Sequence, residues 1–138
     1  MFSWSWNDSY SIGIQTIDEQ HKQLIKIAGK LQDMLQAGDS VDYYDYIIEA
    51  INELKDYTKY HFGYEEEKLK EFNYPDYEDH RMQHLYFVDK IDKISMQDID
   101  NQQLDVISDT LDFLAKWFFS HILNIDTKYV DYVDKNID

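Results

Sequence analysis

Every histidine in this chain lies on the apolar side of a helix-like pattern. The chain has 138 residues and five histidines, and its apolar residues recur at spacings of three and four in four successive segments. Such spacing is typical of amphipathic helices that pack in a bundle. The stripes are Ile17, His21, Leu24, Ala28, Leu31 and Leu35; Ile47, Ile51, Leu54, Thr58, His61, Glu65 and Leu69; Tyr77, His80, His84, Phe87, Ile91 and Ile94; and Leu104, Ile107, Leu111, Leu114, Phe118 and His121. The pattern predicts helices whose histidines face the interior.

The scarcity of helix breakers favours long helices and short loops. The chain has four glycines and one proline, and the breaks fall at residues 37–40, 72–75 and 95–100. Thr16 with Glu19 fits a capping box at the start of the first helix, and Gly38 suits its end. The expected elements are an arm over 1–16, helices over about 17–36, 41–70, 76–94 and 101–121, and a short C-terminal helix over about 127–134. We therefore expect an all-α, antiparallel up-down four-helix bundle, with residues 1–138 forming a single domain.

Composition excludes several classes of protein. The net charge of -15 disfavours nucleic acid and anionic membranes as partners. The chain has no cysteine, which excludes disulfides, thiolate metal sites and iron–sulfur clusters. No apolar stretch approaches the ~20 residues of a membrane helix, and the N-terminus lacks a signal-peptide pattern. We expect a cytoplasmic protein.

The inward histidines are accompanied by carboxylates at helical spacing. His61 precedes Glu65 by four residues, as His80 precedes His84, and side chains four apart on a helix are neighbours. A lone ionised carboxylate in an apolar interior would cost several kcal/mol or take up a proton. A shared cation satisfies the carboxylate and the imidazoles together, so the spacing predicts a metal site inside the bundle.

His121 and Asp126 form a less regular pair. They are five residues apart, which corresponds to a rotation of about 140° on an ideal helix. Asp126 can therefore join the site only if the helix loosens or ends near Asn124. With Asp126 included, the chain offers five imidazoles and two carboxylates, a set that suits iron, zinc, copper or nickel better than calcium or magnesium.

The number of candidate ligands favours two linked ions. Seven ligands with two potential carboxylate bridges exceed what a single zinc ion takes, and carboxylate-bridged pairs in helical bundles are commonly di-iron. The segment from His80 to His84 has the histidine spacing of a zinc protease, but Arg81 stands where the catalytic glutamate would be. No Glu-x-x-His motif occurs, which argues against the ferritin-like di-iron class.

Taken in order, these motifs resemble those of the bacterial hemerythrins over essentially the whole chain. The residues that carry the resemblance are Trp4 and Trp6, the run from Gly13 to Lys22, the run from His61 to Glu66, Tyr74-Pro75, the run from His80 to His84, and the run from His121 to Asp126. The resemblance implies a di-iron centre with an oxo or hydroxo bridge. His80, His84 and His121 would hold one iron, His21 and His61 would hold the other, and Glu65 and Asp126 would bridge them.

The resemblance also implies a function. Dioxygen would bind reversibly at the free position of the iron held by His21 and His61, for carriage, storage or delivery. Reversibility needs a dry pocket, and nearness in sequence to the ligands suggests its lining: Leu24, Ile25, Phe62, Trp117, Phe118 and Ile122. We expect no enzyme and no catalytic residue.

Two alternatives stay open from sequence. One is a module that senses oxygen, nitric oxide or redox state, and the other is a di-iron oxidase or peroxidase. An oxygen-using or signalling partner is possible in either the carrier or the sensor hypothesis. Simpler structural roles are expected for several residues: Trp4 and Trp6 should anchor the arm, Asp18 should be a first-turn helix charge, and Glu66 and Glu67 should be solvated.

Overall fold

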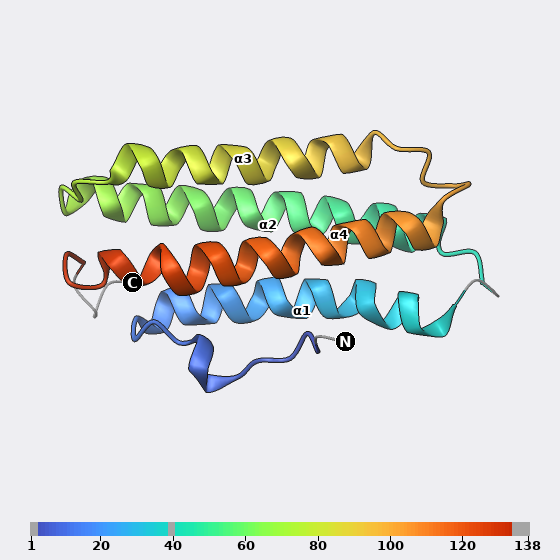
Figure 1. The fold of residues 1–138 in the computed structure, drawn as a ribbon, viewed down its shortest axis with the longest axis horizontal. Helices are drawn as coiled ribbons and strands as arrows, with labels where there is room; N and C mark the ends of the chain where they lie inside the picture. The colour runs from blue at the N-terminus through green and yellow to red at the C-terminus, as the bar shows by residue number, and fades with distance from the viewer. Residues whose placement is uncertain (1–2, 39–40, 134–138) are drawn as a thin grey trace.

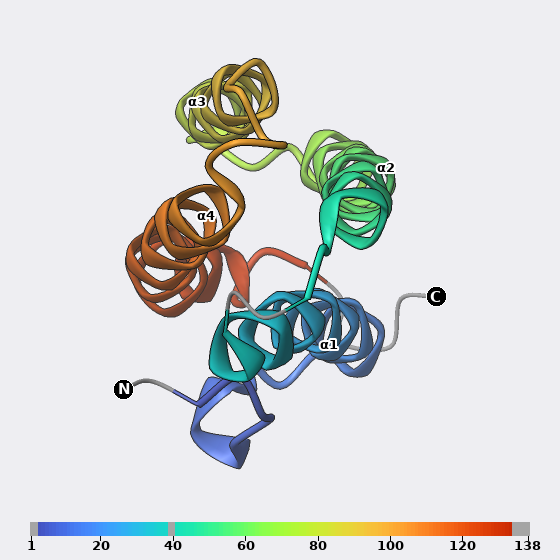
Figure 2. The same ribbon diagram turned by 90° about the vertical axis from the view of Figure 1, so that its right-hand side faces the viewer.

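The computed structural model describes residues 3–38 and 41–133, and its main feature is a bundle of four α-helices. They are α1 (Gln15–Ala37), α2 (Tyr44–Glu71), α3 (Tyr77–Ser95) and α4 (Gln103–Trp117). Successive helices run in opposite directions (Figure 1). The end-on view places α1 beside α2 and α4, and diagonally across from α3 (Figure 2). This arrangement confirms the expected all-α, up-down bundle. None of the helices in the described ranges is long and apolar enough to cross a membrane.

The entry into α1 differs from the expected capping box. The helix begins at Gln15, so Thr16 lies in its first turn and not at the cap position. Asp18 fixes the entry instead, because its carboxylate accepts hydrogen bonds from the backbone N–H of Ile12 at 2.9 Å and from the hydroxyl of Ser11 at 2.5 Å. Asp18 thus lies in the first turn, as expected, and also ties the arm to the helix.

Two local turns end helices cleanly. Gly38 caps α1 with φ 83°, a left-handed conformation that costs glycine little, and the next two residues of the expected break lie outside the described residues. Asn73 ends α2 with φ 54°. The N–H of Tyr74 bonds the carbonyl of Leu69 at 2.9 Å, and that of Asn73 bonds the carbonyl of Lys70 at 3.1 Å, which is a Schellman motif. This turn positions the first residues of α3.

The end of α4 is irregular. The helix continues as a π-helix, η2 (Phe118–Ile122), and after a short helical stretch the chain enters a 3-10 helix, η3 (Asp126–Tyr129). The C-terminal helix expected over about 127–134 is therefore shorter and starts one residue earlier, and residue 134 lies outside the described residues. Asp126 and Tyr129 are 0% and 1% exposed, so the chain turns inward here and does not extend along the surface.

The apolar interior is divided into two clusters. The main core includes Leu31, Ile47, Ile51, Leu54, Ile91, Ile107 and Leu111. The end cluster consists of Ile12, Ile14, Ile17, Leu69, Tyr74, Tyr129 and Val133. Along α2, the main core ends at Phe62 and the end cluster begins at Leu69, with Glu65 between them. A polar layer is thus enclosed by apolar side chains on both sides along the bundle axis.

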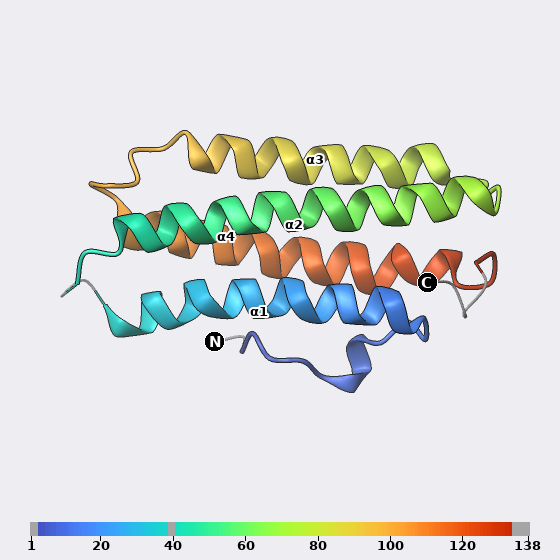
Figure 3. The ribbon, with the colours of Figure 1, turned by 180° about the vertical axis from the view of Figure 1, so that it is seen from behind.

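The N-terminal arm runs back along α1 and carries a short 3-10 helix, η1 (Asp8–Tyr10) (Figures 1 and 3). Trp4 is buried, and its backbone N–H donates to Oε1 of Gln32 at 3.2 Å. A Cβ at Gly29 would lie 3.3 Å from the carbonyl oxygen of Trp4, so this glycine permits the close approach. The contacts confirm that Trp4 anchors the arm.

Candidate metal centre

The five histidines and two carboxylates predicted as ligands gather in the polar layer. The starts of α1 and α3 lie at the same end of the bundle as the ends of α2 and α4, on the left in Figure 1. Each of the seven side chains is 2% exposed or less. They are His21 from α1, His61 and Glu65 from α2, His80 and His84 from α3, His121 from η2 and Asp126 from η3.

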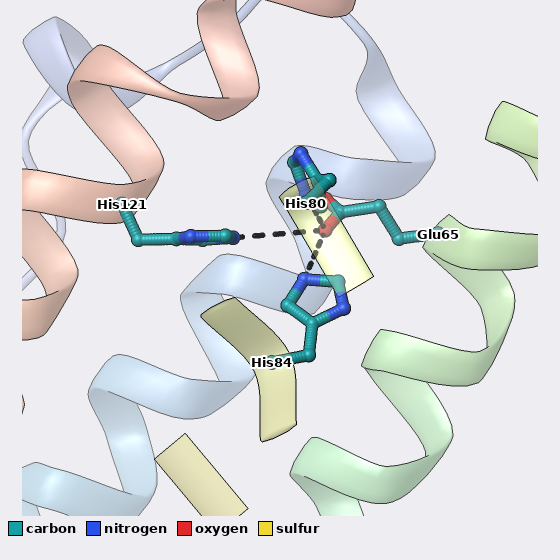
Figure 4. Close-up of side chains that lie close together, drawn as sticks. All are labelled: Glu65, His80, His84 and His121. Carbon is teal, nitrogen blue, oxygen red and sulfur yellow. Dashed lines mark hydrogen bonds and ion pairs between the residues drawn. The ribbon is translucent and has the colours of Figure 1, made fainter. Parts of the chain in front are cut away.

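The seven side chains form two clusters that share Glu65. Within each cluster, one ligand atom per residue lies within 4.8 Å of the others. The three-histidine cluster contains Glu65, His80, His84 and His121 and is drawn in Figure 4. The two-histidine cluster contains His21, His61, Glu65 and Asp126.

Glu65 divides its two oxygens between the clusters. Its Oε1 lies 2.8 Å from Nε2 of His80 and 2.9 Å from Nε2 of His84 (Figure 4). Its Oε2 lies 3.8 Å from Nε2 of His61, in the other cluster. One carboxylate thus faces both groups of imidazoles, as a bridging ligand must.

Asp126 divides its oxygens in the same way. Its Oδ1 lies 3.0 Å from Nε2 of His80 and 3.0 Å from Nε2 of His121. Its Oδ2 lies 3.4 Å from Nε2 of His21. The two carboxylates therefore lie side by side between the same two sets of nitrogens.

The π-helix explains how Asp126 reaches the interior. On an ideal α-helix, Asp126 would be rotated by about 140° from His121. His121 lies inside η2, where the wider turn accommodates an extra residue, and the helix ends before Asp126. The loosening that the sequence required for Asp126 is thus present, and such π turns are frequent at functional sites.

Several polar atoms that face the centre of the layer have no hydrogen-bond partner within the described residues, whereas Nε2 of His80 lies at hydrogen-bond distance from Oε1 of Glu65. Nε2 of His21, His84 and His121, and both carboxylate oxygens of Asp126, are buried without a hydrogen-bond partner. They nevertheless lie close to one another, because they point toward common centres. Adjacent ligands at about 2.1 Å from an octahedral ion are about 3.0 Å apart, which matches the 2.8–3.0 Å separations around His80. The donor set therefore fits two metal ions.

The electrostatics of the layer show how it is balanced without metal. Burial lowers the pKa of His80, but Asp126 and Glu65 outweigh this effect and raise it to about 10. Burial also lowers the pKa of His61, and there the effect dominates, so the pKa falls to about 3. Burial raises the pKa of Glu65, but the surrounding imidazoles, led by His121, hold it well below its usual range. The proton on His80 thus takes the place of a cation between the two ionised carboxylates.

Three histidines are also hydrogen-bonded through Nδ1, the ring nitrogen that faces away from the clusters. We call the residues that accept these bonds, Gln20, Glu66 and Gln83, the outer partners. The contacts are His61 Nδ1 with Oε1 of Gln20 at 2.6 Å, His84 Nδ1 with Oε2 of Glu66 at 2.9 Å, and His121 Nδ1 with Oε1 of Gln83 at 2.9 Å. Each partner atom is an acceptor, so each Nδ1 carries the proton. In the neutral ring this leaves the Nε2 lone pair directed at the cluster.

The outer partners and Tyr129 were missed from sequence. Gln20, Glu66 and Gln83 each directly adjoin a predicted ligand, and this adjacency is the signal that could have identified them. Tyr129 donates a hydrogen bond from its hydroxyl to Oε2 of Glu65 at 2.7 Å. Burial, followed by the charge of Glu65, raises the pKa of Tyr129 well above its usual range, so the hydroxyl stays a donor.

Aromatic rings hold the histidine rings in place. Phe62 stacks on His84 with centroids 4.0 Å apart and an interplanar angle of 6°. Trp117 stacks on His121 at 4.2 Å and 15°. Phe118 meets His21 edge-on at 6.4 Å. These contacts restrict rotation of the imidazoles, so their nitrogens stay aimed at the cluster.

A small cavity lies in the main core, and two of its lining residues contact histidines of the polar layer. Its volume is about 20 Å³, enough for one water-sized molecule. The lining residues are Trp4, Leu24, Ala28, Leu54, Phe87, Leu114, Trp117 and Phe118. Among the predicted pocket residues, Leu24, Trp117 and Phe118 thus line the cavity, whereas Ile25, Phe62 and Ile122 are buried but do not. Phe118 contacts His21 of the two-histidine cluster and Trp117 stacks on His121 of the three-histidine cluster, so the cavity lies near both.

Together, the bundle and its two carboxylate-linked imidazole clusters define a metal-binding helical bundle. Residues 12–133 match the family model described as the hemerythrin HHE cation binding domain. The bacteriohemerythrin of Clostridium acetobutylicum is 36% identical over 126 residues, which cover 91% of this chain and 98% of that protein. The bacteriohemerythrin of Pseudomonas aeruginosa is 33% identical over 128 residues, which cover 93% of this chain and 80% of that protein. A hemerythrin-like protein of Naegleria fowleri is 26% identical over 125 residues, covering 91% and 89%. The chain belongs to the hemerythrin family.

Proposed function

We propose that this chain is a non-heme di-iron protein that binds dioxygen reversibly, for carriage, storage or delivery, and is not an enzyme. Membership of the hemerythrin family supports iron and dioxygen as the cofactor and the ligand. The observation that carries the proposal is the division of Glu65 and Asp126 between two imidazole clusters. Two carboxylates that each face both clusters are what a linked pair of ions requires.

In this proposal the three-histidine cluster would hold one iron through His80, His84 and His121. The two-histidine cluster would hold the other through His21 and His61, Glu65 and Asp126 would be shared by the pair, and an oxo or hydroxo group would complete the centre. The two-histidine ion has fewer protein ligands, so it is the one with room for a diatomic ligand. When bound, the iron pair would supply one electron from each ion to dioxygen and recover both on release.

The surrounding residues would keep the ligand exchange reversible by excluding water. The main core covers one side of the polar layer and the end cluster covers the other. The apolar cavity offers a dry space that is separated from His21 by the ring of Phe118. Tyr129 donates to Glu65 and so holds the bridging carboxylate in one orientation.

The proposal is tested by oxygenation of the reduced, iron-loaded protein. Repeated cycles of oxygen and argon should switch the visible spectrum back and forth without loss of amplitude. His21→Ala should abolish this switch, because it removes a ligand of the ion with the open position and leaves the three-histidine cluster whole. An irreversible spectral change with sustained peroxide release would favour an oxidase, and a partner captured in one oxidation state alone would favour a sensor.

A further inference from the structure

The outer partners of the histidines are chemically unequal. His84 in the three-histidine cluster has a carboxylate partner, Glu66, whereas the partner of His61 in the two-histidine cluster is the neutral amide of Gln20. The outer Nδ1 atoms of His21 and His80 have no hydrogen-bond partner within the described residues. The ion held by the three-histidine cluster would therefore have one more negative charge near its ligands than the other ion.

We propose that Glu66 is a positioning residue that strengthens the three-histidine ion site and makes its ion the more readily oxidised of the two. The inference rests on the dinuclear site proposed above. It assigns a chemical role to a side chain that the sequence pattern places on the solvated flank of α2.

The hydrogen bond from His84 is the route by which Glu66 would act. A carboxylate that accepts the Nδ1–H of a ligating imidazole raises the basicity of its other nitrogen, and a charged acceptor does so more strongly than an amide. Nε2 of His84 lies 2.9 Å from Oε1 of Glu65, inside the cluster. Electron density drawn toward Nε2 would therefore stabilise the higher charge of the ion bound there.

The surroundings of the pair preserve this effect. The side chain of His84 is 2% exposed and that of Glu66 is 23% exposed, so solvent screens the charge only in part. Phe62 stacks on the imidazole of His84 and holds the ring in the orientation that keeps both contacts. Glu67, the next residue, carries the same charge but is exposed, and it therefore serves as a matched control.

The first test compares Glu66→Gln with Glu67→Gln. Gln can still accept the hydrogen bond, so the substitution removes the charge with little change of shape. Titration of the metal-free protein with Co²⁺, a probe that does not need oxygen chemistry, should show two sites in the parent. Glu66→Gln should weaken one of them about tenfold, while Glu67→Gln should leave both unchanged. In the iron-loaded protein, a tenfold change in the ferric-to-ferrous preference would raise the midpoint potential of one step by about 59 mV.

The second test moves the charge to the other cluster. Gln20→Glu combined with Glu66→Gln keeps the net charge and should tighten Co²⁺ binding at the two-histidine cluster while weakening it at the three-histidine cluster. The ratio of the two affinities should therefore change by more than in Glu66→Gln alone, and His61→Ala in each background identifies the two-histidine site as the one that it removes. If the ratio in the double variant equals that of Glu66→Gln alone, a carboxylate beside the imidazole does not strengthen the site.

The outcomes separate this inference from the proposed function. A parent that binds fewer than two Co²⁺ ions would overturn the dinuclear site itself. A parent that binds two ions and oxygenates reversibly, with Glu66→Gln indistinguishable from Glu67→Gln in both affinity and potential, would overturn only the role of Glu66.

Discussion

The main core and the polar layer are formed by the same inward-facing positions of the helices, but they serve different purposes. In the main core, the inward positions hold aliphatic residues such as Leu31, Ile51 and Ile107, whose burial stabilises the fold. In the polar layer, the same stripes continue with His61, Glu65 and their partners, which are equally buried and are balanced by charge and hydrogen bonds and not by apolar packing. The comparison teaches that the periodicity defines the bundle, while the residue type at a few inward positions defines the chemistry. Substitutions should therefore separate stability from metal binding.

The largest effect should come from Glu65→Ala in the polar layer. Both clusters share this carboxylate, so its loss should reduce the metal content from two ions per chain to less than one. The main core is untouched, so far-ultraviolet circular dichroism should show an unchanged helical content. Metal analysis of the purified variant checks the first point, with Glu67→Ala as the exposed control. A variant that still carries two ions would show that the shared carboxylate of Glu65 is not needed to hold them.

Leu31→Ala should give the opposite result in the main core. Leu31 is fully buried at 0% exposure, and such truncations lower the free energy of unfolding by about 2–5 kcal/mol. The metal content should stay at two ions per chain, because Leu31 lies about 15 Å along α1 from His21, the ligand on that helix. Urea denaturation of the metal-free protein measures the loss. A fall in metal content equal to that of Glu65→Ala would mean that metal binding depends on the packing of the main core as much as on the ligands.

The pH dependence of the metal-free protein should come from the polar layer. The pKa of His80 is raised to about 10, so its contribution to stability is complete below the unfolded value near 6.5 and is lost as pH rises toward 10. The pKa of His61 is lowered to about 3, so its contribution is present above about 6.5 and is lost as pH falls toward 3.

Stability of the metal-free protein should therefore be greatest near neutral pH and should fall on both sides. Denaturation midpoints measured across pH test this, and Leu31→Ala should lower the whole curve without changing its shape. Metal loading should flatten the alkaline side, because bound ions replace the protons on the imidazoles. An alkaline limb that is equally steep in the loaded and metal-free proteins would contradict this account.

The smallest effect should follow Tyr129→Phe at the border of the polar layer and the end cluster. The change removes one buried hydrogen bond to Glu65 and keeps the ring, so the free energy of unfolding should fall by about 1–3 kcal/mol. Two ions should still bind, with weaker affinity. Calorimetry of the loaded and metal-free variants measures both quantities, and no change in either would show that the hydroxyl is dispensable.

Periodicity explains why the bundle could be predicted from sequence. Spacings of three and four identify which face of each helix is buried, and the inward positions from Ile47 to Leu69 on α2 are all buried. The ends of the helices were harder to predict than their buried faces, because helix caps depend on local contacts. Thr16 fitted a capping pattern, but the carboxylate of Asp18 binds the arm and lets α1 begin earlier.

The site could be predicted in part for the same reason. Histidines in phase with a stripe must meet in the interior, but Asp126 depended on a π turn that no regular period contains. Gln20 and Glu66 lie on the flanks of their stripes, where periodicity indicates solvent, and their contacts depend on which helices are neighbours. Trp4 lines the cavity although it is far from every ligand in sequence, so nearness along the chain could not reveal it.

Quantitative iron analysis of the purified protein tests the central claim most directly. The claim is that one buried layer holds two ions through shared carboxylates, and it predicts two irons for each folded chain. A single iron per chain, or a stably folded protein that takes up none when ferrous iron is supplied without oxygen, would contradict it.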